Sequence, residues 1–201
     1  MAANSGASTT VNADYSESES ESEWMPFCGT TPDLPHSKHW DSDGFVSPFQ
    51  ATPVHKIATI LTHLNLTEAD VVYDLGCGDG RVLVECTRAS NCSGVGIDLD
   101  DRLVQRAQAN ALRHRVEHRI TFRKADILDP NLDLSSATVL FLYLLPEALS
   151  LLLGVLENLA NDSRSQLKKI VSVRWPLPGV PATTSDAVDN FYIYEAVDLR
   201  S

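Results

Sequence analysis

The chain has 201 residues, of which 43% are hydrophobic, and its formal net charge is −11. This length and hydrophobic content suffice for one globular domain with a substantial core. Most of the excess negative charge lies in residues 1–44, and the remainder of the chain has no large excess of Lys and Arg. The charge therefore argues against nucleic acid as a partner, because a phosphate-backbone footprint needs clustered basic side chains.

The first 40 residues are rich in Ser, Thr, Glu and Pro and lack hydrophobic periodicity. This composition predicts a disordered acidic tail over residues 1–40 and a folded domain over residues 41–201. The repeated Ser-Glu of residues 16–23 is interpreted as a solvated tail; the alternatives are an electrostatic lure for a basic substrate and a phosphorylated tract. No secretory or mitochondrial targeting pattern is present at the start of the chain.

The four cysteines show no spacing typical of metal ligands. They are interpreted as reduced thiols, so we expect no metal site and a cytoplasmic location, with a nuclear location left open.

From residue 52 onward, hydrophobic patterns of helical and strand type alternate. Thr52 and Pro53 are interpreted as the N-cap and first turn of a helix that ends near Leu64. Helices are also expected at 79–89, 100–115 and 146–160, and strands at 70–75, 93–98, 119–124, 137–143, 169–174 and 191–197. Asp100 is expected to cap its helix. This alternation predicts an α/β fold, with a doubly wound, mostly parallel sheet and helices on both faces.

One hydrophobic stretch, residues 137–155, is long enough to span a bilayer. Pro146 and Glu147 interrupt it, and a charged residue at the centre of a membrane helix is costly. We therefore expect a buried strand followed by a helix, and no membrane span.

The stretch VVYDLGCGDGR, residues 71–81, places three alternating glycines after a hydrophobic strand. A strand that feeds a loop without side chains brings its backbone close to a ligand. A nicotinamide fingerprint would need glycine at the position of Arg81, and a phosphate-binding P-loop would need a Lys-Ser/Thr pair. Neither pattern is present, so the class of ligand has to be inferred from the carboxylates that follow the neighbouring strands.

Two further carboxylates follow the next two strands. Asp98 ends the strand at 93–98, where a carboxylate can accept both hydroxyls of a ribose. Asp126 follows the strand at 119–124, where it can meet an adenine amino group while Ile127 covers the ring. Together with the acidic Asp74, these residues predict a site for a cationic, phosphate-free adenosine derivative, either an amino acid carried on adenosine or a sulfonium.

At residues 45–197 the chain resembles the class I S-adenosylmethionine-dependent methyltransferases. DLGCGDG, GIDLD, KADIL and LYLLPE are similar to the first four motifs of that superfamily. The elements Pro48 to Thr52, Tyr73 to Arg81 and Leu142 to Pro146 resemble a narrower group. That group includes small bacterial methyltransferases and protein-lysine methyltransferases that modify mitochondrial membrane proteins. The resemblance implies a Rossmann-like fold and S-adenosyl-L-methionine as cofactor.

The resemblance also implies a role for each motif residue. The residues that would bind the cofactor are Phe49, Thr52, Asp74, Gly76, Gly78, Gly80, Asp98, Asp126 and Ile127. The residues that would line the site of methyl transfer are Tyr143, Leu144, Leu145 and Pro146. Structural alternatives stay open, namely a cap or loop role for each Asp and core packing for Phe49 and Tyr143. Because residues 175–189 are too short for the usual extra helix and strand, we expect an antiparallel C-terminal edge strand.

The favoured function is a protein-lysine N-methyltransferase that acts by in-line methyl transfer to a protein substrate. The alternatives are a small-molecule methyltransferase and a non-catalytic S-adenosylmethionine-binding regulatory protein. A lysine with a reference pKa of about 10.4 must first lose its proton, at a cost of roughly 4–5 kcal/mol at pH 7. An apolar wall at Leu142–Pro146 beside a sulfonium would lower that pKa. No residue is an obvious general base; Glu147 and His55 are named as guesses.

Overall fold

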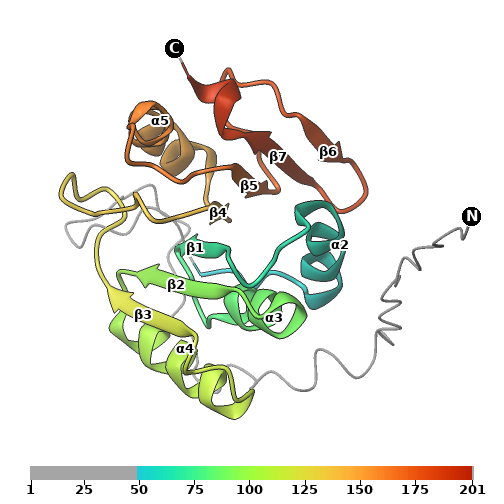
Figure 1. The fold of residues 1–201 in the computed structure, drawn as a ribbon, viewed down its shortest axis with the longest axis vertical. Coiled ribbons are helices and arrows are strands. Elements are labelled where there is room, and N and C mark those ends of the chain that lie inside the picture. Colours follow the sequence, from blue (N-terminus) through green and yellow to red (C-terminus); the bar gives the residue numbers. More distant parts are fainter. Residues whose placement is uncertain (1–48, 201) are drawn as a thin grey trace, which may run out of the picture.

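The computed structural model describes residues 49–200; residues 1–48 and 201 lie outside the described residues, and with them the predicted tail and the start of the predicted domain. Strands and helices alternate along the described chain (Figure 1). In chain order they are α2 (Val54–Leu64), β1 (Val71–Leu75), α3 (Arg81–Ser90), β2 (Ser93–Asp98), α4 (Asp101–Arg113), β3 (Ile120–Lys124), β4 (Val139–Leu142), α5 (Pro146–Asn161), β5 (Lys169–Val173), β6 (Thr184–Asp186), β7 (Phe191–Glu195) and the 3₁₀ helix η1 (Ala196–Leu199).

The strands form one seven-stranded sheet with the order β3-β2-β1-β4-β5-β7-β6. β1 lies at the centre and pairs in parallel with β2 and β4, while β7 runs antiparallel to β5. The strand order reverses beside β1, and the carboxyl ends of strands at such a point form the ligand-binding crevice of doubly wound sheets. The predicted fold class is therefore confirmed.

The C-terminal edge of the sheet contains one strand more than the sequence indicated. Residues 184–186 form β6, which pairs antiparallel with β7, so β7 lies one strand inside the edge. The turn between them is held by the Asp186 carboxylate, which accepts the backbone N–H groups of Val188 and Asp189 at 2.8 Å. A three-residue strand is too short to show a hydrophobic alternation, which is why the sequence did not reveal it.

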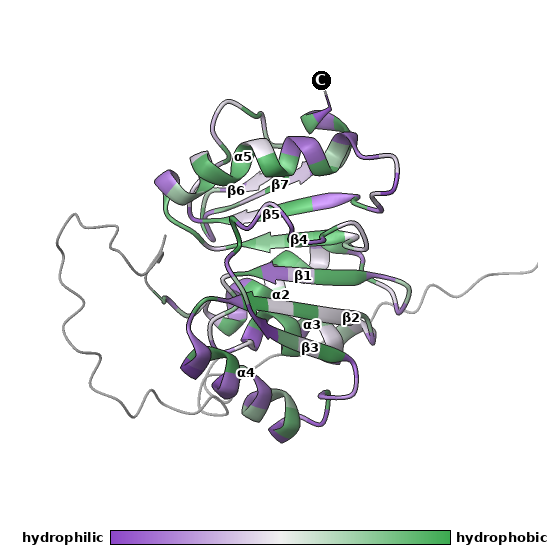
Figure 2. Ribbon diagram, turned by 90° about the vertical axis from the view of Figure 1, so that its left-hand side faces the viewer, coloured by the Kyte–Doolittle hydropathy of each residue, from purple (hydrophilic) through white to green (hydrophobic). Residues whose placement is uncertain are grey.

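Helices cover both faces of the sheet. Buried side chains of α2, α3 and α4 form one hydrophobic cluster, and those of α5 and η1 form the other. The central strands β1 and β4 are largely hydrophobic between these layers (Figure 2). The segment at 137–155 folds as a buried strand followed by α5, as predicted. Among residues 49–200, no helix has both the length and the hydrophobicity needed to cross a membrane.

Two helix starts bear on the capping predictions. Asp100 caps α4 as predicted, since its carboxylate accepts the Arg102 N–H at 2.8 Å. The prediction for Thr52 was wrong: the N-cap of α2 is Pro53, and no side chain caps that helix. Thr52 is instead a buried residue of the segment that leads into α2, and its carbonyl accepts a hydrogen bond from Arg81 Nη1 at 3.4 Å.

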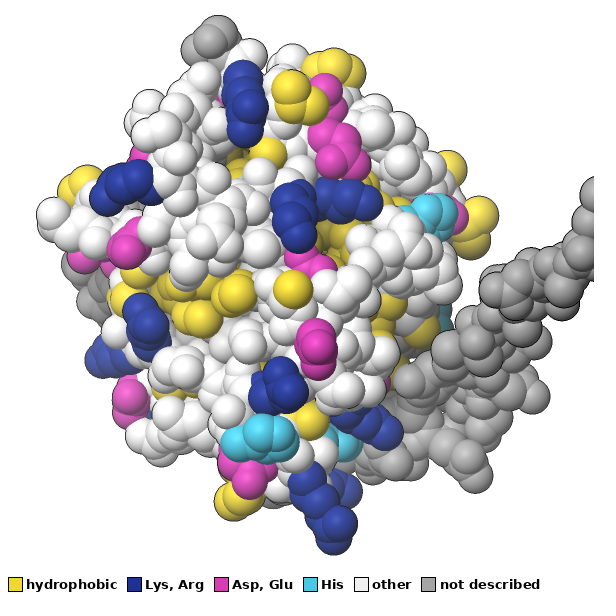
Figure 3. All heavy atoms as spheres, in the orientation of Figure 1, with side chains coloured by type: hydrophobic (Ala, Val, Ile, Leu, Met, Phe, Trp, Pro, Cys, Tyr) yellow, Lys and Arg dark blue, Asp and Glu magenta, His cyan; other side chains and the backbone are white. Residues whose placement is uncertain are grey.

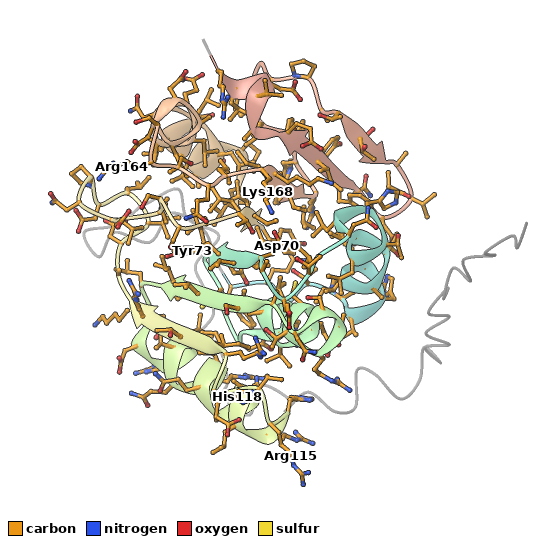
Figure 4. All side chains as sticks on the ribbon, in the orientation of Figure 1. Asp70, Tyr73, Arg115, His118, Arg164 and Lys168 are labelled. Carbon is orange, nitrogen blue, oxygen red and sulfur yellow. The ribbon has the colours of Figure 1, made fainter. Side chains whose placement is uncertain are left out.

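The amino-terminal ends of β1 and β5 are tied together on the face shown in Figure 4. Asp70 accepts Lys168 Nζ at 2.8 Å, and the Thr67 N–H and hydroxyl at 2.9 Å each. Burial raises the pKa of Asp70, but the hydrogen bonds from Lys168, Thr67 and Thr138 outweigh it and lower that pKa to about 2. Tyr73 is held nearby by a 2.9 Å hydrogen bond with Ser136. These contacts join neighbouring strands at the end of the sheet opposite the carboxyl ends of the parallel strands.

Candidate cofactor site

The glycine loop joins the carboxyl end of β1 to α3. Gly76, Gly78 and Gly80 all have positive φ angles, of 86°, 53° and 77°, a conformation that residues with a Cβ adopt at a cost. The N–H groups of Gly76 and Cys77 donate to the Ile97 carbonyl of β2 at 2.8 and 3.0 Å. The loop is therefore fixed against the neighbouring strand, with Gly76 exposed and residues 77–80 buried.

A small pocket, with a cavity volume of about 20 Å³, lies over this loop. It brings together six of the residues predicted from the sequence, namely Phe49, Thr52, Asp74, Gly76, Gly78 and Tyr143. The other lining residues are Gln50, Ala51, Cys77, Asp79, Arg81 and Val82. Cys77 is buried, and burial raises the pKa of its thiol, which suits a protonated side chain packed inside the loop.

The absence of side chains on two glycines leaves room for apolar neighbours. A Cβ on Gly78 would collide with the ring of Phe49, and a Cβ on Gly76 would lie 3.1 Å from Leu144 Cδ2. Phe49 precedes α2 and Leu144 follows β4, so segments far apart in sequence meet on the glycine loop. Leu144 is not among the residues that line the pocket; it packs against the loop at Gly76.

Asp98 connects the glycine loop to the end of β2. Its Oδ2 accepts the Gly78 N–H at 2.9 Å, and its Oδ1 accepts the Asp100 N–H at 3.0 Å. Burial raises the pKa of Asp98, and these two backbone hydrogen bonds oppose that rise. A carboxylate has about four lone-pair positions, so each oxygen retains capacity for one hydroxyl donor.

Asp74 is the carboxylate whose environment most requires a ligand. It is 3% exposed and lines the pocket, and no hydrogen bond to its side chain is found among residues 49–200. Burial, followed by the nearby carboxylates of Asp98 and Asp79, raises its pKa well above the ordinary value. A buried carboxylate without a donor is destabilising unless a cation or donor arrives. The pocket therefore suits a positively charged group.

Arg81 neutralises one of the three carboxylates. Its guanidinium forms a buried ion pair with Asp79, with Nη2 2.8 Å and Nε 3.1 Å from the carboxylate oxygens. Because Nη1 also donates to the Thr52 carbonyl, Arg81 holds the segment before α2 against the loop. The sequence analysis included Arg81 in a motif but predicted no contact for it. The spacing of Asp79 and Arg81 within GDGR was the signal that could have indicated the ion pair. Among residues 49–200, Asp74 and Asp98 have no ion-pair partner, and Asp98 is held by backbone N–H groups alone.

Several predicted site residues lie outside the pocket lining. Asp126 is exposed and accepts the Leu128 N–H at 2.8 Å in a turn, while Ile127 is buried in the core beside it. Pro146 is exposed at the first turn of α5, and Leu145 is its N-cap residue. The roles of Asp126 and Ile127 toward adenine stay predictions.

Gly80 faces the protein interior and not the pocket. A Cβ there would lie 2.8 Å from both Ala107 Cβ of α4 and the Phe122 ring of β3. The absence of a side chain at Gly80 allows α4 and β3 to approach the loop closely, while its contact with the cofactor stays a prediction. A nicotinamide fingerprint would place its packing glycine at the position of Arg81, one residue further on.

We expect Gly80→Ala to lower the free energy of unfolding by about 3–4 kcal/mol, from a left-handed backbone plus overpacking. Gly179→Ala is the matched control, because Gly179 has a similar φ of 72° but nothing within 4 Å of its Cβ position. Its cost should be about 1–2 kcal/mol. Urea unfolding of both variants measures the difference, and equal losses would show that Ala107 and Phe122 do not limit Gly80.

We expect the thermal stabilisation by a cationic ligand to grow as pH rises from 5 to 8. The pKa of Asp74 is raised in the folded protein. Asp74 therefore stabilises the ligand-free fold fully at pH values below its unfolded pKa of about 4. This stabilisation is lost as the pH rises through the folded pKa. Asp74→Asn should therefore raise the melting temperature of the ligand-free protein at pH 8. It should also weaken ligand binding at least about tenfold. A lower ligand-free melting temperature in this variant would contradict the electrostatic account.

Known proteins share both the sequence pattern and the fold. The model of the ANTKMT methyltransferase domain family matches residues 74–184. A protein-lysine N-methyltransferase of Saccharolobus islandicus is 32% identical over 55% of this chain and 68% of its own length. A lysine N-methyltransferase of Caenorhabditis elegans, named for its action on ATP synthase, is 24% identical over 73% of this chain and 75% of its own length.

The crystal structure of an RNA methyltransferase from Salinibacter ruber, in complex with S-adenosyl-L-homocysteine, superposes with a TM-score of 0.64. It is 30% identical and covers 74% of this chain and 94% of its own.

The fold, the glycine loop with its acidic pocket, and these likenesses define a class I S-adenosylmethionine-dependent methyltransferase. S-adenosyl-L-methionine is the cofactor, and its positive charge suits a pocket lined by the Asp74 carboxylate, with Asp98 bonded to the same loop outside the pocket lining. The chain belongs to the ANTKMT methyltransferase domain family.

Proposed function

We propose that the protein is a protein-lysine N-methyltransferase. The observation that carries this proposal is the likeness to relatives named for lysine N-methylation, together with an acidic cofactor pocket that Tyr143 lines. Tyr143 is half-buried, while the neighbouring Leu142 and Leu144 are buried in the core. Two relatives, 32% and 24% identical to the chain, have names that specify lysine N-methylation.

The cofactor supplies a methyl group on a sulfonium, which is already activated for displacement. The residues of this chain would bind and orient the reactants. Asp74 would accept the cofactor's ammonium, Asp98 would accept the ribose hydroxyls, and Phe49 would exclude water above the loop. Holding the lysine nitrogen, methyl and sulfur in line can by itself contribute about 7–11 kcal/mol.

A neutral lysine amine would be favoured by the positive sulfonium of the cofactor, since a nearby like charge lowers the pKa of an amine. Neither candidate general base lies in the pocket lining. His55 is 56% exposed and its Nε2 lies 3.8 Å from Asp189, while Glu147 is exposed in the first turn of α5. The proposal therefore relies on the environment of the amine and not on a dedicated base.

RNA is the acceptor named for one structural neighbour, so it is the main alternative class of macromolecule. The net charge of −11 disfavours binding to a polyanion. On the face shown in Figure 3, basic and acidic side chains are interspersed, and both kinds lie beside each other over much of the surface. We therefore favour a protein acceptor.

The test is transfer of labelled methyl from S-adenosylmethionine into a host-cell extract that is then separated into protein, RNA and small-molecule fractions. Label in a protein band that is recovered as methyl-lysine after hydrolysis supports the proposal. Asp98→Asn should abolish the signal, whereas the exposed Asp101→Asn, three residues away, should retain it. Label confined to RNA or to small molecules would overturn the lysine assignment.

A further inference from the structure

Two aromatic side chains lie where neighbouring strands end. Tyr143 follows β4 and Trp175 lies two residues after β5; these strands pair in parallel, with Leu142 opposite Ser172. The Ser172 hydroxyl donates to the Trp175 carbonyl at 2.7 Å and so fixes the turn after β5. The two rings lie 6.3 Å apart with an interplanar angle of 44°. Tyr143 lines the cofactor pocket, and Trp175 lies beside it outside the pocket lining.

Arg174 occupies the face of this aromatic pair. Its guanidinium carbon lies 4.7 Å from the centre of the Trp175 ring, and its Nη1 donates to Gln50 Oε1 at 3.2 Å. Gln50 lines the cofactor pocket as well. The guanidinium therefore bridges an aromatic face and an amide oxygen at the edge of the pocket.

The backbone of Arg174 is held in an unfavourable conformation. Its φ is 73°, and its N–H donates to the Asn190 carbonyl in the turn before β7. A left-handed conformation in a residue with a long side chain costs energy and tends to occur at functional sites. Here it directs an exposed cationic side chain across the edge of the site.

We propose that Gln50, Tyr143 and Trp175 form the subsite for a cationic methyl acceptor, and that Arg174 occupies this subsite until the acceptor displaces it. An alkylammonium group needs a hydrogen-bond acceptor for its N–H donors and gains from an aromatic face beside its charge. Gln50 Oε1 and the Trp175 ring already provide both features to Arg174. That the acceptor is a lysine rests on the proposed function; the preference of the subsite for a cation does not.

The direct test uses n-butylammonium chloride, with n-butanol as the neutral probe of similar shape. The full chain, saturated with S-adenosyl-L-homocysteine, is titrated while the indole ¹H–¹⁵N resonances of its three tryptophans are followed. Trp175→Phe assigns the Trp175 signal by its loss. We expect that signal to shift saturably with n-butylammonium and not with n-butanol. Equal shifts with both probes, or none, would overturn the proposal.

Arg174 variants test the displacement itself. Arg174→Gln removes the resident cation and should strengthen n-butylammonium binding roughly 3- to 30-fold, the range of one cation–π contact. Arg174→Lys retains a cation and should stay near the wild-type affinity. Weaker binding in Arg174→Gln would overturn the proposal, because Arg174 would then assist the ligand and not compete with it.

Kinetics with the methyl acceptor separate this subsite from the proposed function. Trp175→Leu should raise KM for the acceptor roughly 3- to 30-fold and leave the affinity for S-adenosylmethionine unchanged. Cofactor affinity, measured by calorimetry, also shows that the variant is folded. If methyl label appears only outside protein lysine, the proposed function fails while the titration still reports on the subsite. If lysine is methylated but n-butanol matches n-butylammonium, the subsite fails alone.

Discussion

Asp98→Asn is expected to weaken binding of S-adenosylmethionine about 100-fold or more, because charge-assisted hydrogen bonds are worth roughly 1.5–3 kcal/mol each. The carboxylate accepts the N–H groups of Gly78 and Asp100 at 2.9 and 3.0 Å, so both its oxygens face donors before any ribose is bound. An amide would turn one NH₂ group toward a donor and present a single oxygen. The loss should therefore affect both the loop and the ribose.

Calorimetric titration with S-adenosyl-L-homocysteine measures this effect without reference to the acceptor. Asp101→Asn is the matched control, since Asp101 is exposed and bonds to Gln105 on α4. Thermal unfolding without ligand distinguishes a lost contact from a lost fold. A cofactor affinity of Asp98→Asn within a factor of about five of the wild type would contradict the role of Asp98, because that factor is only about 1 kcal/mol.

Arg81→Met is expected to lower the free energy of unfolding by about 3–5 kcal/mol, because it leaves the buried Asp79 carboxylate without its cation. Asp79 is 1% exposed, and Arg81 also donates to the Thr52 carbonyl. Loss of this contact should loosen the segment carrying Phe49 and Thr52, so cofactor affinity should fall as well. Urea unfolding and calorimetry measure the two effects.

The double variant Asp79→Asn with Arg81→Met should recover most of the lost stability, because a neutral amide is cheaper to bury than an unpaired carboxylate. Cofactor affinity should recover less, since the contact to Thr52 is still missing. Arg164→Met is the control, because it removes an ion pair to Asp162 of the same 2.8 Å length in which the Arg164 side chain is 79% exposed. This variant should scarcely change the free energy of unfolding. Additive losses in the Asp79 and Arg81 variants would show that the pair is not coupled.

Local sequence signals determined the order of elements and the chemical character of the site. The short hydrophobic runs of β1 and β4, the helical spacing of α4 and α5, and the cap at Asp100 are properties of short segments. The glycine loop with Asp74, followed by Asp98 at the end of the next strand, is likewise a matter of spacing within one α/β unit. These features needed no knowledge of distant contacts, and so the sequence predicted them.

The tertiary structure alone decided which residues meet across long stretches of chain. Arg81 reaches the carbonyl of Thr52, Gly80 faces Ala107 and Phe122, and Arg174 bridges Trp175 and Gln50. Each contact joins separate elements whose relative positions depend on packing of the whole sheet, so no local pattern encodes it. The three-residue β6 could not be predicted for a related reason, since it forms by pairing with β7. The sequence by itself therefore predicted the class of ligand, and the tertiary structure determined which side chains surround the ligand site.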